Sequence, residues 1–234
     1  MTSQVELQVK CVHNGRYNVF VIADDEYIGR AIASGHEWDG WMREDVQRYY
    51  KGGTDILDIG ANIGYNSLMF SDYGPVHSFE PVFYKLVDLN AKNNKIKNPI
   101  NIYPIALSDR KEDVDMYIPN KVDRSGLRNY GGTSMYKTDG FDETTKTPVE
   151  CHKLDDVYGG VPSLIKIDVE GHEMEVLRGA ENTIKKYKPT LLIEIFDFEN
   201  NEVPKYLKSL GYGEPEPRPE HVYLYRAKDI FSTI

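Results

Sequence analysis

Short apolar runs alternate with longer segments of mixed polarity from residue 54 onwards. Each run has about five residues, the usual length of a β-strand, and each longer segment has the length of a helix. Strands that alternate with helices in this way predict βαβ units and a parallel sheet. The predicted core strands span 55–59, 76–80, 100–105, 163–168 and 190–195, and the helices span 65–72, 81–94, 172–187 and 202–210.

The end of the chain departs from this alternation. Two apolar stretches, 212–214 and 221–226, flank a proline-rich segment and predict an antiparallel hairpin. A hairpin at the edge of a parallel sheet gives a mixed sheet of about seven strands. Shorter stretches at 116–118 and 149–154 predict additional strands. The expected fold class is therefore α/β, with a mixed, mostly parallel sheet and helices on both faces.

Residues 1–50 have a pattern of their own. Alternating apolar positions surround Asn14-Gly15, a dipeptide typical of a tight hairpin turn, and two short helices are expected after it. This region is predicted to be a small β-hairpin and helical appendage to a main domain of 51–234. Within it, 35–38 is expected either to close over a ligand as a lid or to be a connector packed by tryptophans.

One long segment, 119–146, has little periodicity and is rich in Gly, Asp, Thr, Asn and Lys. An irregular stretch of this length in a compact domain is usually functional or mobile. We expect a loop on the substrate side, with Gly131 to Ser134 as the part most typical of a site. Plain surface disorder is the equal alternative.

A glycine-rich turn follows the first core strand. Gly60 and Gly64 remove side chains where backbone approaches a ligand or takes a positive φ, and Asp58 adds a carboxylate near the end of the strand. That end of a parallel sheet is where ligands bind. Glu80 ends the next strand, at the spacing expected for a carboxylate that binds ribose hydroxyls. Together these features predict a nucleoside-binding half-fold.

The turn does not fit a dinucleotide. The fingerprint G-x-G-x-x-G, counted from Gly60, requires glycine at the positions of Asn62 and Tyr65. A ligand with a ribose and no phosphate fits better, and S-adenosylmethionine is such a ligand, because its cationic sulfonium tolerates nearby acids. The alternative is an ordinary strand–turn–helix unit with glycines for packing.

Composition excludes several classes of protein. The net charge of −9 argues against non-specific binding of nucleic acid, which depends on neutralising phosphates. No apolar run is long enough to span a membrane, and the polar start of the chain differs from a signal peptide. Cys11 and Cys151 fit no metal spacing and are typical of a reducing compartment. We therefore expect a cytoplasmic protein with no nucleic-acid partner.

A second acidic group follows the fourth core strand. Asp168 ends that strand and should share a sheet edge with Glu80, while His172 begins the next helix. Glu194 lies in an apolar strand, where a carboxylate is costly unless it is paired or used. These three residues are predicted to converge at the crevice. In the alternative, Glu170 and Glu173 are acids at a helix start, His172 is a cap, and Lys166 pairs with Glu194.

Five blocks in this order resemble the FkbM family of methyltransferases: LDIGANIG, SFEP, IKIDVEGHE, VLRGA and PTLLIE. The resemblance covers about 54–195 and implies a class I, Rossmann-like fold that binds S-adenosylmethionine and methylates hydroxyl groups. Acceptors in the family are often sugars of glycans or natural products. The residues expected to contact the cofactor are Asp58, Gly60, Ala61, Asn62, Gly64, Glu80, Ala106, Leu107, Ser108 and Asp168.

Methyl transfer to a hydroxyl needs the proton to leave as the oxygen attacks, so a general base is expected. His172 is the first candidate because of its ordinary pKa, with Asp168 next and Glu194 beside them. Alternatively, Asp168 and Glu194 hold Mg²⁺ or another divalent cation, which lowers the pKa of the acceptor hydroxyl. The competing functions are methylation of RNA or protein on the same fold, and a non-catalytic nucleoside-binding module of a glycan-synthesis assembly.

Overall fold

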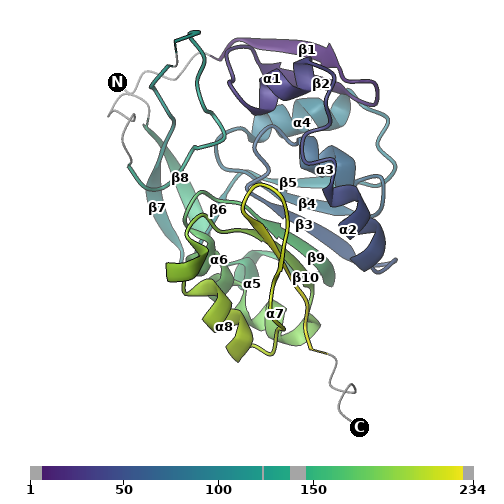
Figure 1. Cartoon of the computed structure of the whole chain (residues 1–234), viewed down its shortest axis with the longest axis vertical. Coiled ribbons are helices and arrows are strands. Elements are labelled where there is room, and N and C mark those ends of the chain that lie inside the picture. The colour runs from purple at the N-terminus through teal and green to yellow at the C-terminus, as the bar shows by residue number, and fades with distance from the viewer. Residues whose placement is uncertain (1–6, 123, 138–145, 229–234) are drawn as a thin grey trace.

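The computed structural model describes residues 7–122, 124–137 and 146–228. Its centre is a seven-stranded sheet in the order β11-β12-β10-β9-β3-β4-β5 (Figure 1). The five strands from β10 to β5 are parallel, and β12 is antiparallel to both of its neighbours. The predicted fold class is confirmed. The strands are β3 Asp55–Ile59, β4 Val76–Phe79, β5 Ile100–Tyr103, β9 Pro162–Ile167, β10 Thr190–Glu194, β11 Glu216–Pro217 and β12 Val222–Tyr225.

The order of the strands creates a crevice in the middle of the sheet. The chain runs from β3 outward through β4 to β5, then crosses over and continues with β9 on the other side of β3. In open α/β sheets ligands bind where the strand order reverses, at the carboxyl ends of the strands. Ile59 pairs with Ile167 in register, so the residues that follow, Gly60 and Asp168, meet at this point.

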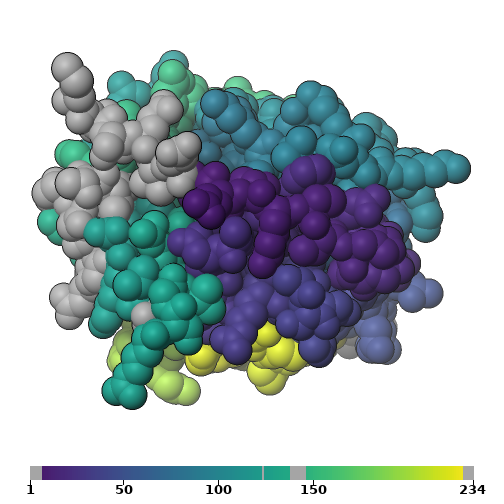
Figure 2. Space-filling model, turned by 90° about the horizontal axis from the view of Figure 1, so that it is seen from above, coloured from purple at the N-terminus to yellow at the C-terminus, as the bar shows by residue number. Residues whose placement is uncertain are grey.

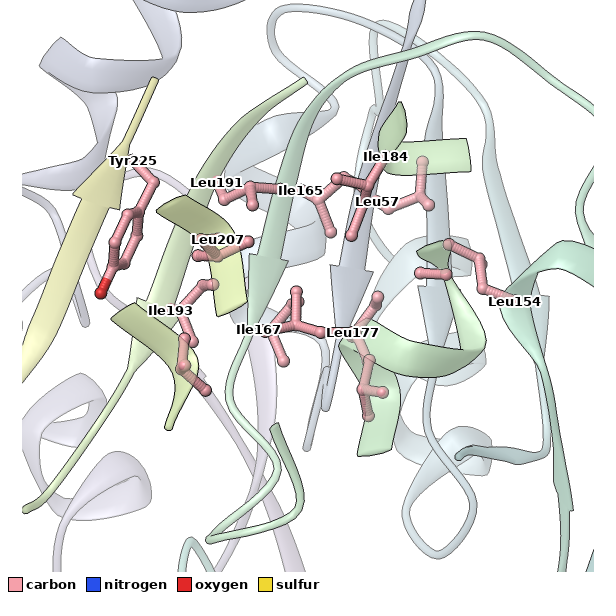
Figure 3. Packing of buried hydrophobic residues seen from close by; sticks show 14 of the residues in the cluster. Leu57, Leu154, Ile165, Ile167, Leu177, Ile184, Leu191, Ile193, Leu207 and Tyr225 are labelled. Carbon is pink, nitrogen blue, oxygen red and sulfur yellow. The ribbon is translucent and has the colours of Figure 1, made fainter. Parts of the chain in front are cut away.

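Helices cover both faces of the sheet, because neighbouring residues of a strand point to opposite sides. On one face, Leu57 and Ile165 join a buried cluster with Leu177 and Ile184 (Figure 3). The helices on this face are α5 Leu154–Val157, α6 Glu173–Gly179, α7 Glu181–Tyr187 and α8 Val203–Ser209, and the 3₁₀ helix η2 Phe198–Asn200 precedes α8. On the other face, α2 Met42–Tyr49 and α3 Tyr65–Phe70 pack on Ile56 and its neighbours, with α4 Tyr84–Lys92 beside α3.

The single helix predicted over 172–187 is wrong, because α6 ends at Gly179 and α7 begins at Glu181. Gly179, a poor helix former, is the last residue before the break and lies in close contact with the chain beneath it. A Cβ atom at this glycine would lie 1.9 Å from the carbonyl oxygen of Ser108. The helix therefore touches the segment after the third core strand at a position that only glycine fits.

The N-terminal region shares its core with the main sheet. The hairpin of β1 Val9–His13 and β2 Asn18–Ile22 has the predicted turn, and α1 Ile28–Ala33 follows it. Val19, Val21 and Ile32 pack in one buried cluster with Leu68 of α3 and Leu86 of α4. The N-terminal elements are therefore held against the helices that flank the glycine turn.

A second, three-stranded sheet lies beside the first. Its order is β6-β8-β7, with β6 Ala106–Leu107, β7 Glu112–Tyr117 and β8 Lys146–His152. The sequence pattern predicts strands at 116–118 and 149–154 but no separate sheet. Strand β7 begins earlier than predicted because Glu112 and Asp113 are partly or fully exposed, which hides the strand pattern. Among the described residues, no helix is long and apolar enough to cross a membrane.

Candidate active site

A cavity of about 530 Å³ lies at the carboxyl edge of the central sheet. Its floor is formed by the residues that follow β3, β4, β9 and β10. Its walls come from the segment between α1 and α2, the segment around 129–135, and the loop that enters β12. The crevice predicted from the strand order is thus enclosed by segments from both ends of the chain.

The glycine turn after β3 brings two strands together. Gly60 has φ +77°, and a Cβ atom there would lie 1.8 Å from the carbonyl oxygen of Asp168. Gly64 has φ +84° and packs against Val87 of α4, outside the cavity lining. Ala61 and Asn62, which are predicted to contact the cofactor, form the part of the turn that lines the cavity. The turn needs glycine at position 60 because the end of β9 leaves no space for a side chain.

Glu80 lies in the cavity wall and also stabilises the turn. One carboxylate oxygen, Oε2, accepts a hydrogen bond from the backbone N–H of Asn62 at 2.9 Å. The other, Oε1, accepts bonds from the N–H groups of Val82 and Phe83 at 2.8 and 2.9 Å. Burial raises the pKa of Glu80 to about 6, against the opposing effect of these three bonds. The carboxylate therefore holds the ends of β3 and β4 in a fixed relation beside the cavity.

Three carboxyl groups meet on the opposite side of the crevice. Asp168, Glu170 and Glu194 each offer an oxygen within 4.8 Å of the others, a group that suits a metal ion or a shared proton. Oε2 of Glu194 is buried and has no hydrogen-bond partner. Burial, followed by the charges of Asp168 and Glu170, raises the pKa of Glu194 well above its ordinary value. Burial and the charges of Asp168 and Glu173 raise the pKa of Glu170 to about 8.

The sequence pattern predicts Glu170 only as an acid at the start of a helix. The turn that carries it has positive φ at Glu170 (+55°) and Gly171 (+98°), and this turn directs the chain back over the sheet edge. The glycine after Glu170 in the sequence was the available signal for such a turn. As a result, the acidic group has three members where Asp168 and Glu194 alone had been expected.

Lys166 is the buried positive charge beside this group. Its Nζ donates to the carbonyl oxygen of Gly60 at 2.8 Å and lies 3.0 Å from Asp168 Oδ2 and 3.6 Å from Asp58 Oδ1. The alternative pairing of Lys166 with Glu194 is not observed. Asp58 is fully buried beneath the turn, where its Oδ2 accepts a hydrogen bond from Ser67, and it does not line the cavity.

His172 lies behind the cavity wall. Its Nε2 is 3.0 Å from Ser108 Oγ, and its Nδ1 is 2.9 Å from the hydroxyl of Tyr136, so both ring nitrogens have a hydrogen-bond partner. Burial lowers the pKa of His172. Ser108 and His172 are absent from the cavity lining, whereas Ala106 and Leu107 are part of it, at the position expected for the adenine.

Connecting segments form the remaining walls. Trp38, the last residue of the predicted lid segment 35–38, lines the cavity. Three further lining residues are not marked by the sequence pattern: Asp39, Phe196, which is 57% exposed, and Glu220. Asp39 is buried, and burial together with its hydrogen bond to Glu220 raises its pKa. No strand or helix pattern marks these positions, because all of them lie in connecting segments.

The predicted substrate loop contributes to the wall in part. Gly131 and Thr133 line the cavity, and Ser134 Oγ donates to the carbonyl oxygen of Glu170 at 2.8 Å. Residues 123 and 138–145 of that loop lie outside the described residues. Its described part thus supports the turn that carries Glu170.

The sheet order, the antiparallel β12 and the cavity at the strand ends define a class I methyltransferase fold. Within this class, the family model described as the methyltransferase FkbM domain matches residues 58–213. The chain therefore belongs to the FkbM methyltransferase family, and the resemblance found in the sequence is confirmed.

Individual relatives support this membership. The chain is 30% identical over 139 residues to the hexuronic acid methyltransferase AglP of Haloferax volcanii, a match that covers 56% of this chain and 52% of AglP. It is 25% identical to Methyltransferase 1 of Beauveria bassiana, over 70% of this chain and 74% of that protein. The chain thus spans about half the length of AglP.

Two solved structures show the same fold. A methyltransferase FkbM from Methylobacillus flagellatus aligns with a TM-score of 0.52 and 16% identity, over 79% of this chain and 50% of that one. A putative rRNA methylase from Clostridium thermocellum aligns with a TM-score of 0.51 and 10% identity, over 81% of this chain and 96% of that one. At these identities the two structures establish the fold alone.

Proposed function

We propose that this protein is an S-adenosylmethionine-dependent O-methyltransferase that acts on a hydroxyl group of a carbohydrate. The observation that carries the proposal is the arrangement of one cavity, with Glu80 beside the glycine turn on one side and the three-carboxyl group on the other. The first side suits a nucleoside, and the second suits a hydroxyl that must lose its proton. Membership of the FkbM family implies S-adenosylmethionine as the methyl donor.

The cofactor would lie along the ends of β3 and β4. Glu80 would accept hydrogen bonds from the ribose hydroxyls, while Gly60 to Asn62 would border the methionine part. Ala106 and Leu107 would border the adenine, because both line the cavity beyond the end of β5. Asp58 and Gly64, which were expected to touch the cofactor, would act from beneath by shaping the turn.

The acidic group would provide the general base. In the transfer, a bond forms between the acceptor oxygen and the methyl carbon while the bond from that carbon to sulfur breaks, and sulfur keeps the electron pair. The hydroxyl proton passes to the carboxylate of Glu170, which is suited as the base because burial raises its pKa to about 8, close to the range that general bases need. General base assistance is worth roughly 10²–10⁴ in rate.

The expected role of His172 as the base is replaced in this proposal. Both ring nitrogens of His172 are used by Ser108 and Tyr136, and the ring does not line the cavity. His172 would instead hold β6 and the segment containing Tyr136 in place around the start of α6.

The same carboxyl group would also suit a divalent cation. Asp168, Glu170 and Glu194 supply hard oxygen ligands of the kind Mg²⁺ prefers. An ion held there would lower the pKa of the acceptor hydroxyl, and the carboxylates would then orient the acceptor rather than take its proton.

A carbohydrate acceptor is supported by two observations. AglP, with which the chain shares 30% identity, is named a hexuronic acid methyltransferase. In addition, Tyr27, Trp38 and Phe196 place aromatic rings in the cavity wall, and flat apolar rings suit the faces of a sugar. RNA is disfavoured by the net charge of −9 and by Lys166 being the one basic side chain, histidine apart, in the described lining.

The first experiment is calorimetric titration with S-adenosylmethionine, S-adenosylhomocysteine and NAD, with and without Mg²⁺. We expect micromolar binding of the first two and none of NAD. A methyl-transfer assay on neutral, amino and uronic-acid glycosides, with an RNA oligonucleotide beside them, then tests the acceptor. A folded protein that binds neither S-adenosyl compound would refute the proposal, and binding without transfer to any acceptor would favour the non-catalytic module.

A further inference from the structure

A second polar group lines the cavity, apart from the three-carboxyl group. It consists of Asp39, between α1 and α2, Asn66, in the first turn of α3, and Glu220, in the loop that enters β12. Asn66 Nδ2 donates a hydrogen bond to Asp39 Oδ2 at 2.8 Å. The carboxyl group of Asp39 also shares a hydrogen bond with that of Glu220. Segments from both ends of the chain therefore meet at one point of the wall.

This group has an excess of hydrogen-bond acceptors. Oδ1 of Asn66 has no partner, although the residue is only 6% exposed. A buried acceptor without a donor costs about 1–3 kcal/mol, so the arrangement favours a ligand that supplies N–H groups. Asp39 and Glu220 bring two carboxyl groups together, an arrangement that favours a positively charged ligand. The nearby ammonium of Lys166 is already held by Asp168 and by the carbonyl oxygen of Gly60.

The position of Glu220 is fixed by an ion pair close to it in sequence. Arg218 donates through Nε and Nη2 to both oxygens of Asp45 in α2, at 2.6 and 3.0 Å. Asp45 is buried, so this paired geometry anchors the loop firmly against α2. Figure 2 shows the result, with the yellow C-terminal residues against the dark blue N-terminal helical segment. Glu220 itself is exposed, and the anchored loop holds its carboxyl group beside the buried Asp39.

We propose that Asp39, Asn66 and Glu220 form a subsite for a primary ammonium group. Three N–H bonds of an ammonium match the open amide oxygen and the two carboxyl groups in number and in charge. This inference rests on the proposed function, because it concerns a ligand of the same cavity.

The methionine part of the cofactor is the favoured source of the ammonium. Asn66 lies in the first turn of the helix that follows the glycine turn, which is where the proposed pose places the amino-acid end. An amino sugar as acceptor would offer the same chemical group. The two sources differ in whether binding of the cofactor or use of the acceptor depends on the subsite.

The test compares two ligands that differ in the amino-acid part. S-adenosylhomocysteine carries the ammonium, whereas 5′-methylthioadenosine has the same nucleoside and sulfur without it. We expect Asp39→Asn and Glu220→Gln each to weaken binding of S-adenosylhomocysteine about tenfold, as loss of one charge-assisted bond would. Binding of 5′-methylthioadenosine should stay within about twofold. Glu44→Gln, an equal charge change at an exposed position of α2, is the matched control and should alter neither.

Asn66→Ala provides an independent variant, since it removes the open amide oxygen without changing a charge. Thermal melting of each variant confirms that it is folded. If binding of S-adenosylhomocysteine is unchanged, the acceptor is tested with p-nitrophenyl glucosaminide and p-nitrophenyl glucoside. A rise in KM for the amino sugar alone would assign the subsite to the acceptor.

Two outcomes would overturn the inference, and they are distinguishable. If folded variants keep wild-type affinity for S-adenosylhomocysteine and wild-type KM for both glycosides, the subsite is wrong while the proposed function stands. If the wild-type protein binds neither S-adenosylhomocysteine nor 5′-methylthioadenosine, the cofactor assignment and the subsite both fail.

Discussion

Replacement of Glu80 tests the cofactor site most directly. In Glu80→Ala, the backbone N–H groups of Asn62, Val82 and Phe83 lose their common acceptor. A buried donor left unpaired costs about 1–3 kcal/mol, so three of them should lower the free energy of unfolding by about 3–9 kcal/mol. This is a large part of the stability of a typical domain, and Glu80→Ala alone would therefore confuse loss of binding with loss of folding.

Glu80→Gln separates the two effects. The amide keeps one oxygen, which can still accept from Val82 and Phe83, but its NH₂ group meets the N–H of Asn62 without an acceptor. We expect a loss of about 1–3 kcal/mol in stability, so the variant should remain folded. Binding of S-adenosylhomocysteine should also weaken by about 1–3 kcal/mol, because a charge-assisted bond to the ribose becomes a neutral one.

The pH dependence of binding gives the test its specific signature. Burial raises the pKa of Glu80 to about 6, and ribose hydroxyls donate to the ionised carboxylate. Binding therefore favours the deprotonated form, and the affinity should fall below pH 6, by up to about tenfold per pH unit. Glu80→Gln should bind more weakly at pH 7.5 and lack this fall. Titration calorimetry between pH 5 and pH 8 measures both. Equal affinity and equal pH dependence in wild type and variant would refute the ribose role.

Three further predictions concern the rest of the site. Gly60→Ala should lower the free energy of unfolding, measured by chemical denaturation, by more than about 3 kcal/mol, because its Cβ would collide with the backbone of Asp168. The control Gly53→Ala, at φ +80° with open space around it, should lower it by about 1 kcal/mol. Equal losses in the two variants would contradict this account. The raised pKa of Glu194 means that the folded protein binds this proton more tightly than the unfolded chain does. Stability should therefore fall as the pH rises above 4.5, the ordinary pKa of a glutamate. In thermal melts, Glu194→Gln should reduce this loss of stability between pH 5 and pH 8 by about 1–3 kcal/mol. His172→Ala should lower stability by about 1–3 kcal/mol and leave turnover within about tenfold of wild type, whereas Glu170→Gln should lower turnover more than about 100-fold. The reverse order of the two losses in turnover would restore the histidine as base.

The sequence was sufficient for the inner strands β3, β4, β9 and β10 of the central sheet because most of their residues are buried. Strand β9, for example, reads as a continuous apolar run from Leu164 to Ile167, interrupted only by Lys166. The predicted edge strand at 212–214 is wrong, because the strand beside β12 is β11 at Glu216–Pro217. The three-stranded sheet was missed because Glu112, Asp113 and Asp115 place charged side chains along β7. A strand that is exposed on one side and carries acids has no apolar run for pattern analysis to detect.

Within the site, residues that directly follow a strand were placed correctly. Gly60, Glu80 and Asp168 all line the cavity, because the strand ends of a parallel sheet meet at one edge. Asp58 lies inside β3, where its side chain points to the helical face beside Ser67. His172 begins α6, and its ring turns toward Ser108. For both residues, the direction of the side chain decides whether the residue lines the cavity. The spacing of residues in the sequence does not specify that direction.

The polar wall formed by Asp39 and Glu220 depends on tertiary structure alone. The two residues lie far apart in the sequence, each in a connecting segment, and both fall outside the part matched by the family model, 58–213. Gly60, Glu80, Asp168 and Glu194 all fall inside it. The matched part therefore contains the proposed nucleoside and base residues, while two of the three proposed ammonium ligands come from the flanking segments. The ion pair of Arg218 with Asp45 joins those segments and holds the two sides of the wall together.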